Sequence, residues 1–305
     1  MKIIKYLFIL ILLVNTSTSY SNDIDFSKWK IDFKEYAIKQ NISIQTLNNV
    51  IDKAKFLPDV IKYDRYQPEF YEDTRTYIQK RSSDKKIKKG KIILKKNINF
   101  IEKISKEFSI DKNLLLALMG IETNFGTYLG KMDIVSSLAT LSYDKRRSDF
   151  FTSELIILLK LIEKKMIDPS VLFGSWAGAF GNFQFMPSTI NNYAIDYNND
   201  YKIDLKSIED SFASAANYLN NLGWNDEIPC FFEIELDKNI PLKYLNTSAK
   251  KINNKNNVIF FKKYINNSDF LNEFEDLNAA IVTPDVDIVP ETDKYKPAYI
   301  VFDNY

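Results

Sequence analysis

The chain contains no histidine and only one cysteine, Cys230. The first absence excludes Ser-His-Asp and Cys-His mechanisms and every metal site that uses an imidazole ligand. Acid–base chemistry therefore falls to Glu, Asp, Tyr or Lys side chains. A single cysteine cannot form an intrachain disulfide, and Cys230 lies far from any chemical motif. We therefore expect a small, buried apolar residue there.

An excess of either charge is also absent, because 41 basic residues stand against 40 acidic residues in a chain of 305. The sequence lacks the bulk positive charge of nucleic-acid-binding proteins, so we expect no nucleic-acid partner. The length suits one large or two modest domains. Glycine is scarce as well, and seven of the eight glycines lie between 120 and 223.

The N-terminus has the pattern of a targeting segment. Lys2 and Lys5 precede the apolar run YLFILILLV, which is too short to span a bilayer comfortably. Ser19 and Ser21 fit the small-residue positions of a cleavage site, which predicts an exported, soluble mature chain that begins near Asn22. An uncleaved anchor helix is the alternative. No cysteine lies near the predicted cleavage point, so a lipid anchor is unsupported.

Apolar spacing predicts helices over 26–37, 47–54 and 150–165, and Ser43 is a candidate N-cap for the second of them. The stretch SSDKKIKKGKIILKK, residues 82–96, is strongly basic. It is interpreted as a solvated helix face. The alternative is attraction to an anionic polymer or to a membrane surface, with peripheral membrane association as the consequence.

The stretch ALMGIETNFG, residues 117–126, holds one acid in an almost apolar helix. Ser109 is the candidate N-cap of this helix, and Gly126 is its candidate stop. At about 100° per residue, Glu122 lies within about 20° of Leu115, on the face that the helix should bury. A carboxylate on a buried face must be paired, protonated or in use.

The segment GSWAGAFGNFQFMPSTI, residues 174–190, interleaves three glycines with four aromatic residues. Glycine permits close backbone approach, and aromatic rings offer flat apolar faces. A groove for sugar rings needs both, together with hydroxyl and amide groups such as those of Ser175 and Gln184. Tight helix packing through the glycines is the alternative interpretation.

Several segments resemble the membrane-bound lytic murein transglycosylase B family of bacteria. They are LLLALMGIETNFG, LATLSYDKRRSDFF, GSWAGAFGNFQFMPSTINNYAIDYNND and ASAANYLNNLGW, in this order and spacing, with DRYQPEF upstream. The likeness extends over 60–305 and is densest over 110–224. It implies a lysozyme-like helical core that acts on peptidoglycan glycan strands in the periplasm. The implied reaction cuts the β-1,4 bond between N-acetylmuramic acid and N-acetylglucosamine without water, leaving a 1,6-anhydro sugar.

The resemblance assigns roles residue by residue and requires no cofactor. Glu122 becomes the single acid and base: it protonates the departing oxygen, then takes the proton of the C6 hydroxyl. Other residues are similar to positions that bind substrate in the family: Ser175, Gln184, Phe185, Met186, Tyr218, Tyr77 and Asn124. Ordinary glycosidases need a second carboxylate, and spacing does not single out any of Asp133, Asp144 and Glu154. Phe150 departs from the family, some members of which carry a tyrosine there.

The segment DYNNDYKID, residues 196–204, resembles the start of an EF-hand calcium loop. A structural calcium ion would use the residues at its odd positions and a later acid: Asp196, Asn198, Asp200, Lys202 and Asp210. Two departures weaken the likeness, because Tyr201 replaces the turn glycine and Ser207 replaces the bidentate Glu. An Asx-rich turn without metal is the alternative.

The expected fold is mainly α (α+β), with a signal peptide at 1–21, a helical region at 22–108, a catalytic core at 109–228 and a small β subdomain at 229–305. Strands are expected at FFEIEL, NVIFFKKY and AYIVFDNY. In the family, a further segment completes the core, and we expect it to be missing after Tyr305. The main hypothesis is a lytic transglycosylase, with a hydrolytic muramidase as a variant. The alternative is a peptidoglycan-binding protein whose catalysis is weakened or lost.

Overall fold

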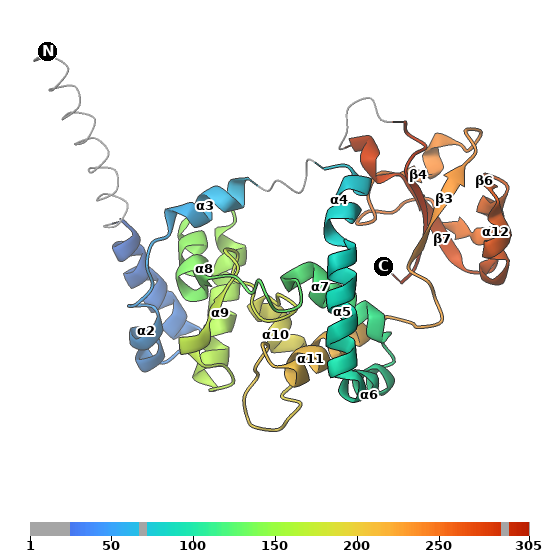
Figure 1. The fold of residues 1–305 in the computed structure, drawn as a ribbon. Helices are drawn as coiled ribbons and strands as arrows, with labels where there is room; N and C mark the ends of the chain where they lie inside the picture. Colours follow the sequence, from blue (N-terminus) through green and yellow to red (C-terminus); the bar gives the residue numbers. More distant parts are fainter. Residues whose placement is uncertain (1–24, 67–71, 288–292, 305) are drawn as a thin grey trace, which may run out of the picture. The chain divides into compact units, whose positions relative to one another are not determined.

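The computed structural model describes residues 25–66, 72–287 and 293–304 (Figure 1). The predicted signal peptide lies outside these residues. Contacts divide the described chain into two units, the first with 25–66 and 122–215, the second with 72–121 and 216–304. The division differs from the expected 22–108, 109–228 and 229–305, because segments far apart in sequence pack within each unit. Among the described residues, no helix combines the length and apolar character needed to cross a bilayer.

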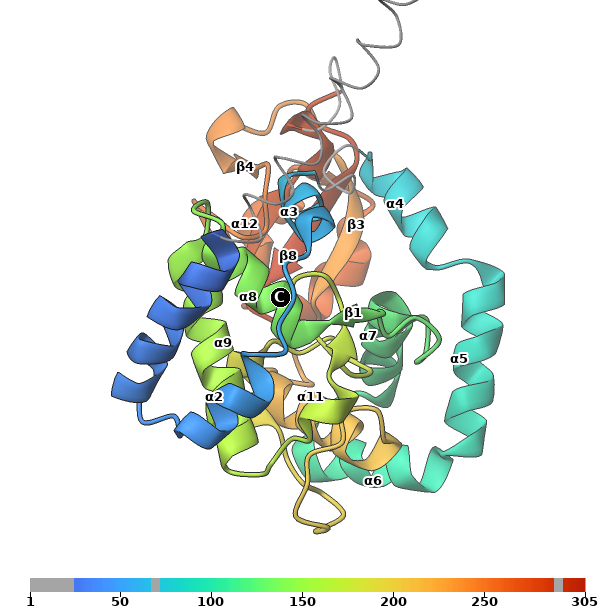
Figure 2. The ribbon, with the colours of Figure 1, turned by 90° about the vertical axis from the view of Figure 1, so that its left-hand side faces the viewer.

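The first unit is a group of helices around one buried helix, α8. Residues 25–39 are helical, and the further elements are α2 (Ile44–Val50), α3 (Pro58–Arg65), β1 (Met132–Asp133), α8 (Ile134–Tyr143), α9 (Ser148–Glu163), β2 (Phe173–Gly174) and α10 (Pro187–Tyr193). Every residue of α8 from Ile134 to Ser142 is buried, and α9 lies alongside it (Figures 1 and 2). As predicted, Ser43 caps α2, since its Oγ accepts a hydrogen bond from Thr46 N at 3.1 Å.

Hydroxyl groups on α8 hold the chain that passes beside it. Ser136 Oγ accepts from Lys55 N at 2.9 Å, and Thr140 Oγ1 accepts from Leu57 N at 3.0 Å. Buried polar groups need such partners, because leaving them without one costs about 1–3 kcal/mol each. The polar residues of this helix therefore fix the connection between α2 and α3.

The second unit combines helices with a small sheet. Its helices are α4 (Thr74–Arg81), α5 (Asp84–Lys96), α6 (Ile98–Phe108) and α12 (Val258–Lys262), while α7 (Lys112–Thr123) and α11 (Ile208–Asn221) run from one unit into the other. The sheet has the order β4-β7-β8-β3-β6, and β5 also pairs with β7. Its strands are β3 (Phe231–Leu236), β4 (Leu245–Asn246), β5 (Asn256–Asn257), β6 (Ile265–Asn266), β7 (Asn278–Val282) and β8 (Ala298–Phe302).

Alternating residues of the three longest strands bury one face of this sheet. The antiparallel register places Ile281 opposite Ile300, and Ile234 opposite Ala298. These side chains share one apolar cluster with Val258 and other buried residues. The expected strands at FFEIEL and AYIVFDNY are confirmed.

Two local expectations are wrong. The segment NVIFFKKY forms α12 instead of a strand, because Val258 and Phe261, spaced i and i+3, are both fully buried. Ser109 does not cap α7. It ends α6 in a left-handed conformation (φ 53), and Asp111 caps α7 by accepting from Asn113 N at 2.8 Å and Leu114 N at 3.0 Å. A carboxylate reaches both free amides of the first turn and complements the helix dipole.

Candidate active site

Glu122 lies one residue from the C-terminal end of α7. The expected burial is wrong, since the side chain is exposed although Leu115 and Met119 on the same face are buried. At the end of a helix, no further turn follows to cover the side chain. The surroundings still remove enough water to raise the pKa of the Glu122 carboxyl above its ordinary value, and desolvation is the only cause. Within the described residues, this carboxylate makes no hydrogen bond or ion pair.

The backbone turns sharply directly after this residue. Asn124, Phe125 and Gly126 have φ values of 48°, 58° and 73°, so three successive residues are left-handed. Only glycine adopts this conformation freely, and side-chain-bearing residues hold it where the surroundings impose it. Thr123 supplies one such constraint, because its Oγ1 accepts from Gly126 N at 3.0 Å. Gly126 therefore follows the helix end by three residues, close to its predicted place as a stop.

Ser175 lies in a second tight turn of the first unit. Its main-chain N donates to Ala179 O at 2.8 Å, and its Oγ accepts from Ala179 N at 3.0 Å. Gly130 packs against the start of this turn so closely that a Cβ on it would lie 2.0 Å from Gly174 O. The chain that follows Glu122 thus packs against the turn of Ser175, and a place of Ser175 beside the acid stays a prediction.

The third converging segment contains Gln184. Phe180 and Phe185 exchange main-chain hydrogen bonds, and Gln184 sits between them with a φ of 49°. Its Nε2 donates to Gly181 O at 2.9 Å and to Leu129 O at 3.4 Å. The amide N–H groups thus bind the protein's own backbone, whereas the Oε1 atom makes no hydrogen bond among the described residues.

The aromatic residues and glycines of 174–190 serve packing more than expected. Phe185 is 8% exposed and lies 6.5 Å from the Phe183 ring centre, so it has little surface for a sugar. A Cβ on Gly178 would lie 2.4 Å from Leu138 Cδ2, so this turn packs closely against α8. Met186 is half-buried in front of α10.

The two candidate tyrosines belong to the second unit. Tyr77 is half-buried on α4, and the Arg81 guanidinium lies 4.8 Å from its ring centre. Tyr218 is half-buried on α11. Their place beside Glu122 stays a prediction.

Each competing acid has a structural partner. Asp133 caps α8 by accepting from Ser136 N at 2.6 Å, and Asp144 pairs with the Arg65 guanidinium at 2.7 Å. Glu154, which is 3% exposed, accepts from Ser188 N at 2.9 Å and Ser188 Oγ at 2.6 Å and so caps α10. Of these four carboxylates, only that of Glu122 is unengaged.

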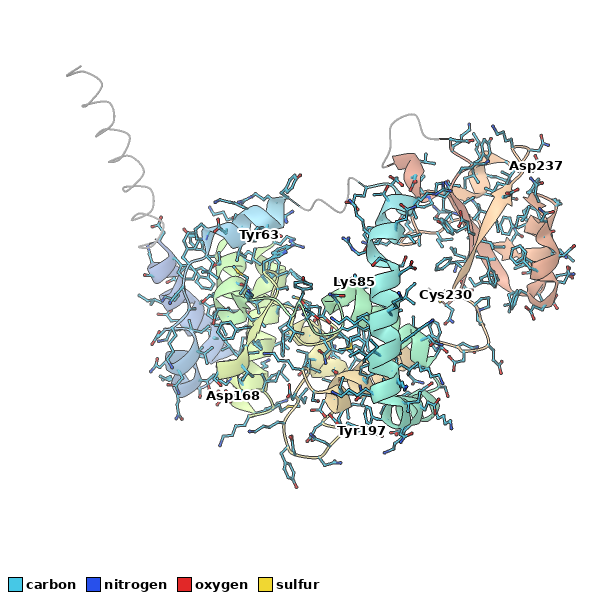
Figure 3. All side chains as sticks on the ribbon, viewed as in Figure 1. Tyr63, Lys85, Asp168, Tyr197, Cys230 and Asp237 are labelled. Carbon is cyan, nitrogen blue, oxygen red and sulfur yellow. The ribbon has the colours of Figure 1, made fainter. Side chains whose placement is uncertain are left out.

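The loop between α10 and α11, which Tyr197 marks in Figure 3, contains four of the predicted calcium ligands, and the fifth, Asp210, lies in the first turn of α11. Asp196 accepts from Tyr201 N at 2.7 Å, and Asp200 accepts from Lys202 N at 2.9 Å. Asp210 is fully buried and accepts from Tyr197 N and Asp204 N, each at 2.9 Å. Its burial raises the pKa of the Asp210 carboxyl.

The donor chemistry of this loop suits a hard cation, because the predicted ligands offer only oxygen atoms. In the described ranges, however, no three His, Cys, Asp or Glu side chains lie close enough together to hold a metal ion. The carboxylates accept backbone amides instead, as in an Asx-rich turn. Calcium binding would require them to move together.

Sequence reasoning missed two residues of this region, Thr123 and Asn182. Thr123 Oγ1 donates to Asn182 O at 2.8 Å, and both residues are buried. The available signals were a threonine that directly follows the acid and an asparagine between a glycine and a phenylalanine. Neither signal specifies a contact between residues 59 positions apart.

The helices of both units and the small sheet define a lysozyme-like protein of mainly α structure. The chain belongs to the transglycosylase SLT domain family, whose model matches residues 25–305. Membrane-bound lytic murein transglycosylase B of Escherichia coli (strain K12) is 38% identical over 118 residues, which are 38% of this chain and 33% of that protein. The matched segment thus spans about a third of the length of this curated relative. The resemblance to this family is confirmed.

Solved structures agree on the fold. SltB3 from Pseudomonas aeruginosa, in complex with NAG-NAM-pentapeptide, is 27% identical with a TM-score of 0.81, covering 92% of this chain and 73% of that one. Slt35 of Escherichia coli, a lytic transglycosylase solved in complex with calcium, is 23% identical with a TM-score of 0.69. That match covers 92% of this chain and 84% of that chain.

Proposed function

We propose that this protein is a periplasmic lytic transglycosylase that cuts peptidoglycan glycan strands at the β-1,4 bond between N-acetylmuramic acid and N-acetylglucosamine. The observation that carries the proposal is the Glu122 carboxyl group, which has no partner in the described residues and a pKa raised by desolvation alone. A general acid that works near neutral pH must hold its proton, and desolvation favours the protonated form.

Glu122 then serves both proton transfers. Its carboxyl proton passes to the glycosidic oxygen while the C1–O bond breaks, and the N-acetyl oxygen of the muramic sugar stabilises C1 from the substrate side. The Glu122 carboxylate next removes the proton from the C6 hydroxyl, whose oxygen bonds to C1 and closes the 1,6-anhydro ring. Water does not enter the product, and Glu122 ends protonated as it began.

Substrate contacts complete the proposal. Ser175 Oγ already accepts from Ala179 N, so its hydroxyl hydrogen is available for a sugar oxygen. The Oε1 atom of Gln184, and the side chains of Asn124 and Met186, are the remaining contacts on the first unit. Tyr77 and Tyr218 stay proposed contacts on the strength of the resemblance, which also includes Phe185 although its ring has little exposed surface.

We also propose that loop 196–210 takes a structural calcium ion through Asp196, Asn198, Asp200 and Asp210, with Lys202 offering its main-chain carbonyl. The likeness to an EF-hand and the all-oxygen donor set support this assignment. Calcium takes no part in the reaction as written above.

The mass of the products tests the proposed reaction. Purified peptidoglycan is digested with the protein, and the soluble fragments are weighed. A lytic transglycosylase gives 1,6-anhydro ends, a muramidase gives reducing ends that are one water heavier, and a binding protein gives no fragments. Glu122→Gln should abolish the products, and Glu35→Gln, at an exposed glutamate on the helix of residues 25–39, is the matched control. Reducing ends, or no fragments from the parent protein, would overturn the proposal.

A further inference from the structure

The residue that follows Glu122 is completely buried, although Glu122 itself is exposed. The Oγ1 atom of Thr123 donates to Asn182 O at 2.8 Å and accepts from Gly126 N at 3.0 Å. The first bond ties the end of α7 to the segment of Gln184. The second closes the left-handed turn that follows the helix. The hydroxyl group of Thr123 therefore fixes the main chain directly after Glu122.

Asn182 extends the connection to the next helix. It is 3% exposed, and its main-chain N donates to Leu205 O at 2.7 Å. Its Nδ2 group donates to Ser211 Oγ at 3.0 Å, at the beginning of α11, and also reaches the main-chain oxygens of Lys206 at 3.1 Å and Ser207 at 3.3 Å. The residue thus binds loop 196–210 and α11 with its side chain, and Thr123 with its main-chain oxygen.

This connection matters because Glu122 lacks hydrogen bonds of its own among the described residues. Nothing holds its carboxyl group directly, so the position of the helix end determines where the carboxyl group lies. A displacement of about 1 Å between reacting groups can cost about 10²-fold in rate. The hydroxyl group of Thr123 is a side-chain contact that ties this helix end to the main chain of Asn182.

We propose that Thr123 and Asn182 are positioning residues for Glu122, a pair that we call the Thr123–Asn182 link. The inference rests on the proposed role of Glu122 as the general acid. The link acts on the rate of the chemical step and not on glycan binding, because neither buried residue offers surface to a substrate. A residue that served the fold alone would change stability and leave the rate of the folded protein intact.

The test uses the full chain and begins with three substitutions. Thr123→Val keeps the shape of the side chain but removes both hydrogen bonds, whereas Thr123→Ser keeps the hydroxyl group. Thr140→Val is the matched control, because Thr140 is equally buried on α8 and its Oγ1 accepts a main-chain hydrogen bond from Leu57 N at 3.0 Å. Melting temperature, kcat, KM and the affinity for glycan fragments are measured for each variant well below its melting temperature.

Thr123→Val should lower kcat by about 10²-fold, with KM and glycan affinity close to those of the parent. Thr123→Ser should restore most of the rate, and Thr140→Val should lose stability but keep its kcat. Asn182→Ala, which removes only the outer part of the link, should lower kcat by a smaller factor with KM unchanged. If Thr123→Val does not fold, the Asn182→Ala variant still tests the link. The double variant should lose no more rate than the worse single variant, because both changes act through one connection.

Two results would overturn the link. One is a kcat for Thr123→Val that equals that of Thr140→Val while Glu122→Gln is inactive. The other is an Asn182→Ala variant that changes KM alone. A Glu122→Gln variant with full activity is a different failure, because it removes the proposed function itself.

Discussion

Glu122→Gln replaces one carboxyl oxygen by an amide group and leaves the size of the side chain unchanged. The substitution breaks no hydrogen bond or ion pair of Glu122 in the described residues. General acids and bases are typically worth about 10² to 10⁴ in rate. Because Glu122 serves both proton transfers in the proposed reaction, we expect a loss at the upper end of this range, which corresponds to about 5.5 kcal/mol of the activation barrier. Binding should persist, since Ser175 and Gln184 keep their contacts.

The same substitution should also change how stability depends on pH. Desolvation raises the pKa of Glu122 in the folded state, so the folded protein holds this proton more tightly than the unfolded chain does. The parent therefore loses stability as the pH rises from the unfolded pKa through the folded pKa, and Gln removes this loss. The variant should equal the parent at a pH below both pKa values and be slightly more stable near neutrality. The effect should be small because the side chain is exposed.

The assays are turnover on purified peptidoglycan, affinity for glycan fragments, and melting temperature as a function of pH. Glu35→Gln controls for the loss of one negative charge at an exposed site. A Glu122→Gln variant that retains more than about a tenth of the parent's turnover would lie above the range for such groups and refute the mechanism. A variant that is less stable than the parent near neutral pH would show that the charged carboxylate has a stabilising partner, contrary to the reasoning.

Three further predictions concern other parts of the chain. Asp64→Ala should destabilise the fold by about 3–5 kcal/mol in chemical denaturation, because the buried carboxylate pairs with Arg146 and Arg147. The exposed pair Asp59–Lys62 is the control, and Asp59→Ala should cost less than about 1 kcal/mol. If loop 196–210 binds calcium, stability should rise by about 2.7 kcal/mol at a hundredfold excess over the dissociation constant. A melting temperature that is the same in millimolar calcium and in chelator would contradict calcium binding by this loop. Finally, α5, which carries Lys85 in Figure 3, has seven lysines and one acid in 13 residues. It should bind vesicles of phosphatidylglycerol and phosphatidylcholine in a salt-sensitive way. Changing Lys88, Lys91 and Lys95 to Glu should abolish this binding, and the same change at the exposed Lys28, Lys39 and Lys53 should not.

The sequence predicts those features of the candidate site that depend on local patterns. The apolar period around Glu122 identifies its helix, whereas the places of Ser175 and Gln184 beside the acid stay a prediction from the family motifs. The apolar periodicity identifies the buried face of a helix, but it does not show whether neighbouring elements still cover that face at the helix end. The exposure of Glu122 therefore does not follow from the sequence. The segment with Val258 and Phe261 was predicted as a strand, because a short apolar run fits the period of a strand as well as that of a helix.

Tertiary contacts account for the other differences. In its glycine-rich segment, Phe185 is predicted to offer its ring to a sugar, but Phe183 and the surrounding core bury that ring. The bond between Thr123 and Asn182 joins two polar residues whose local sequences contain no sign of each other. Turn conformations such as that of Gln184 depend on partners elsewhere, here the main-chain oxygen of Leu129.

The engagement of the neighbouring acids bears directly on the type of product. Hydrolysis by the usual two-carboxylate route needs a second free carboxylate to activate water or attack the sugar. Asp133 and Glu154 each cap a helix, and Asp144 pairs with Arg65. Releasing a cap costs about 0.5–2 kcal/mol, and a released Glu154 would be a buried charge without a partner. In the proposed reaction, the C6 hydroxyl of the substrate needs no such release, because Glu122 would have lost its proton and could accept another. The engagement of these three acids thus supports the proposed ring closure over hydrolysis, and a reducing-end product would refute this argument.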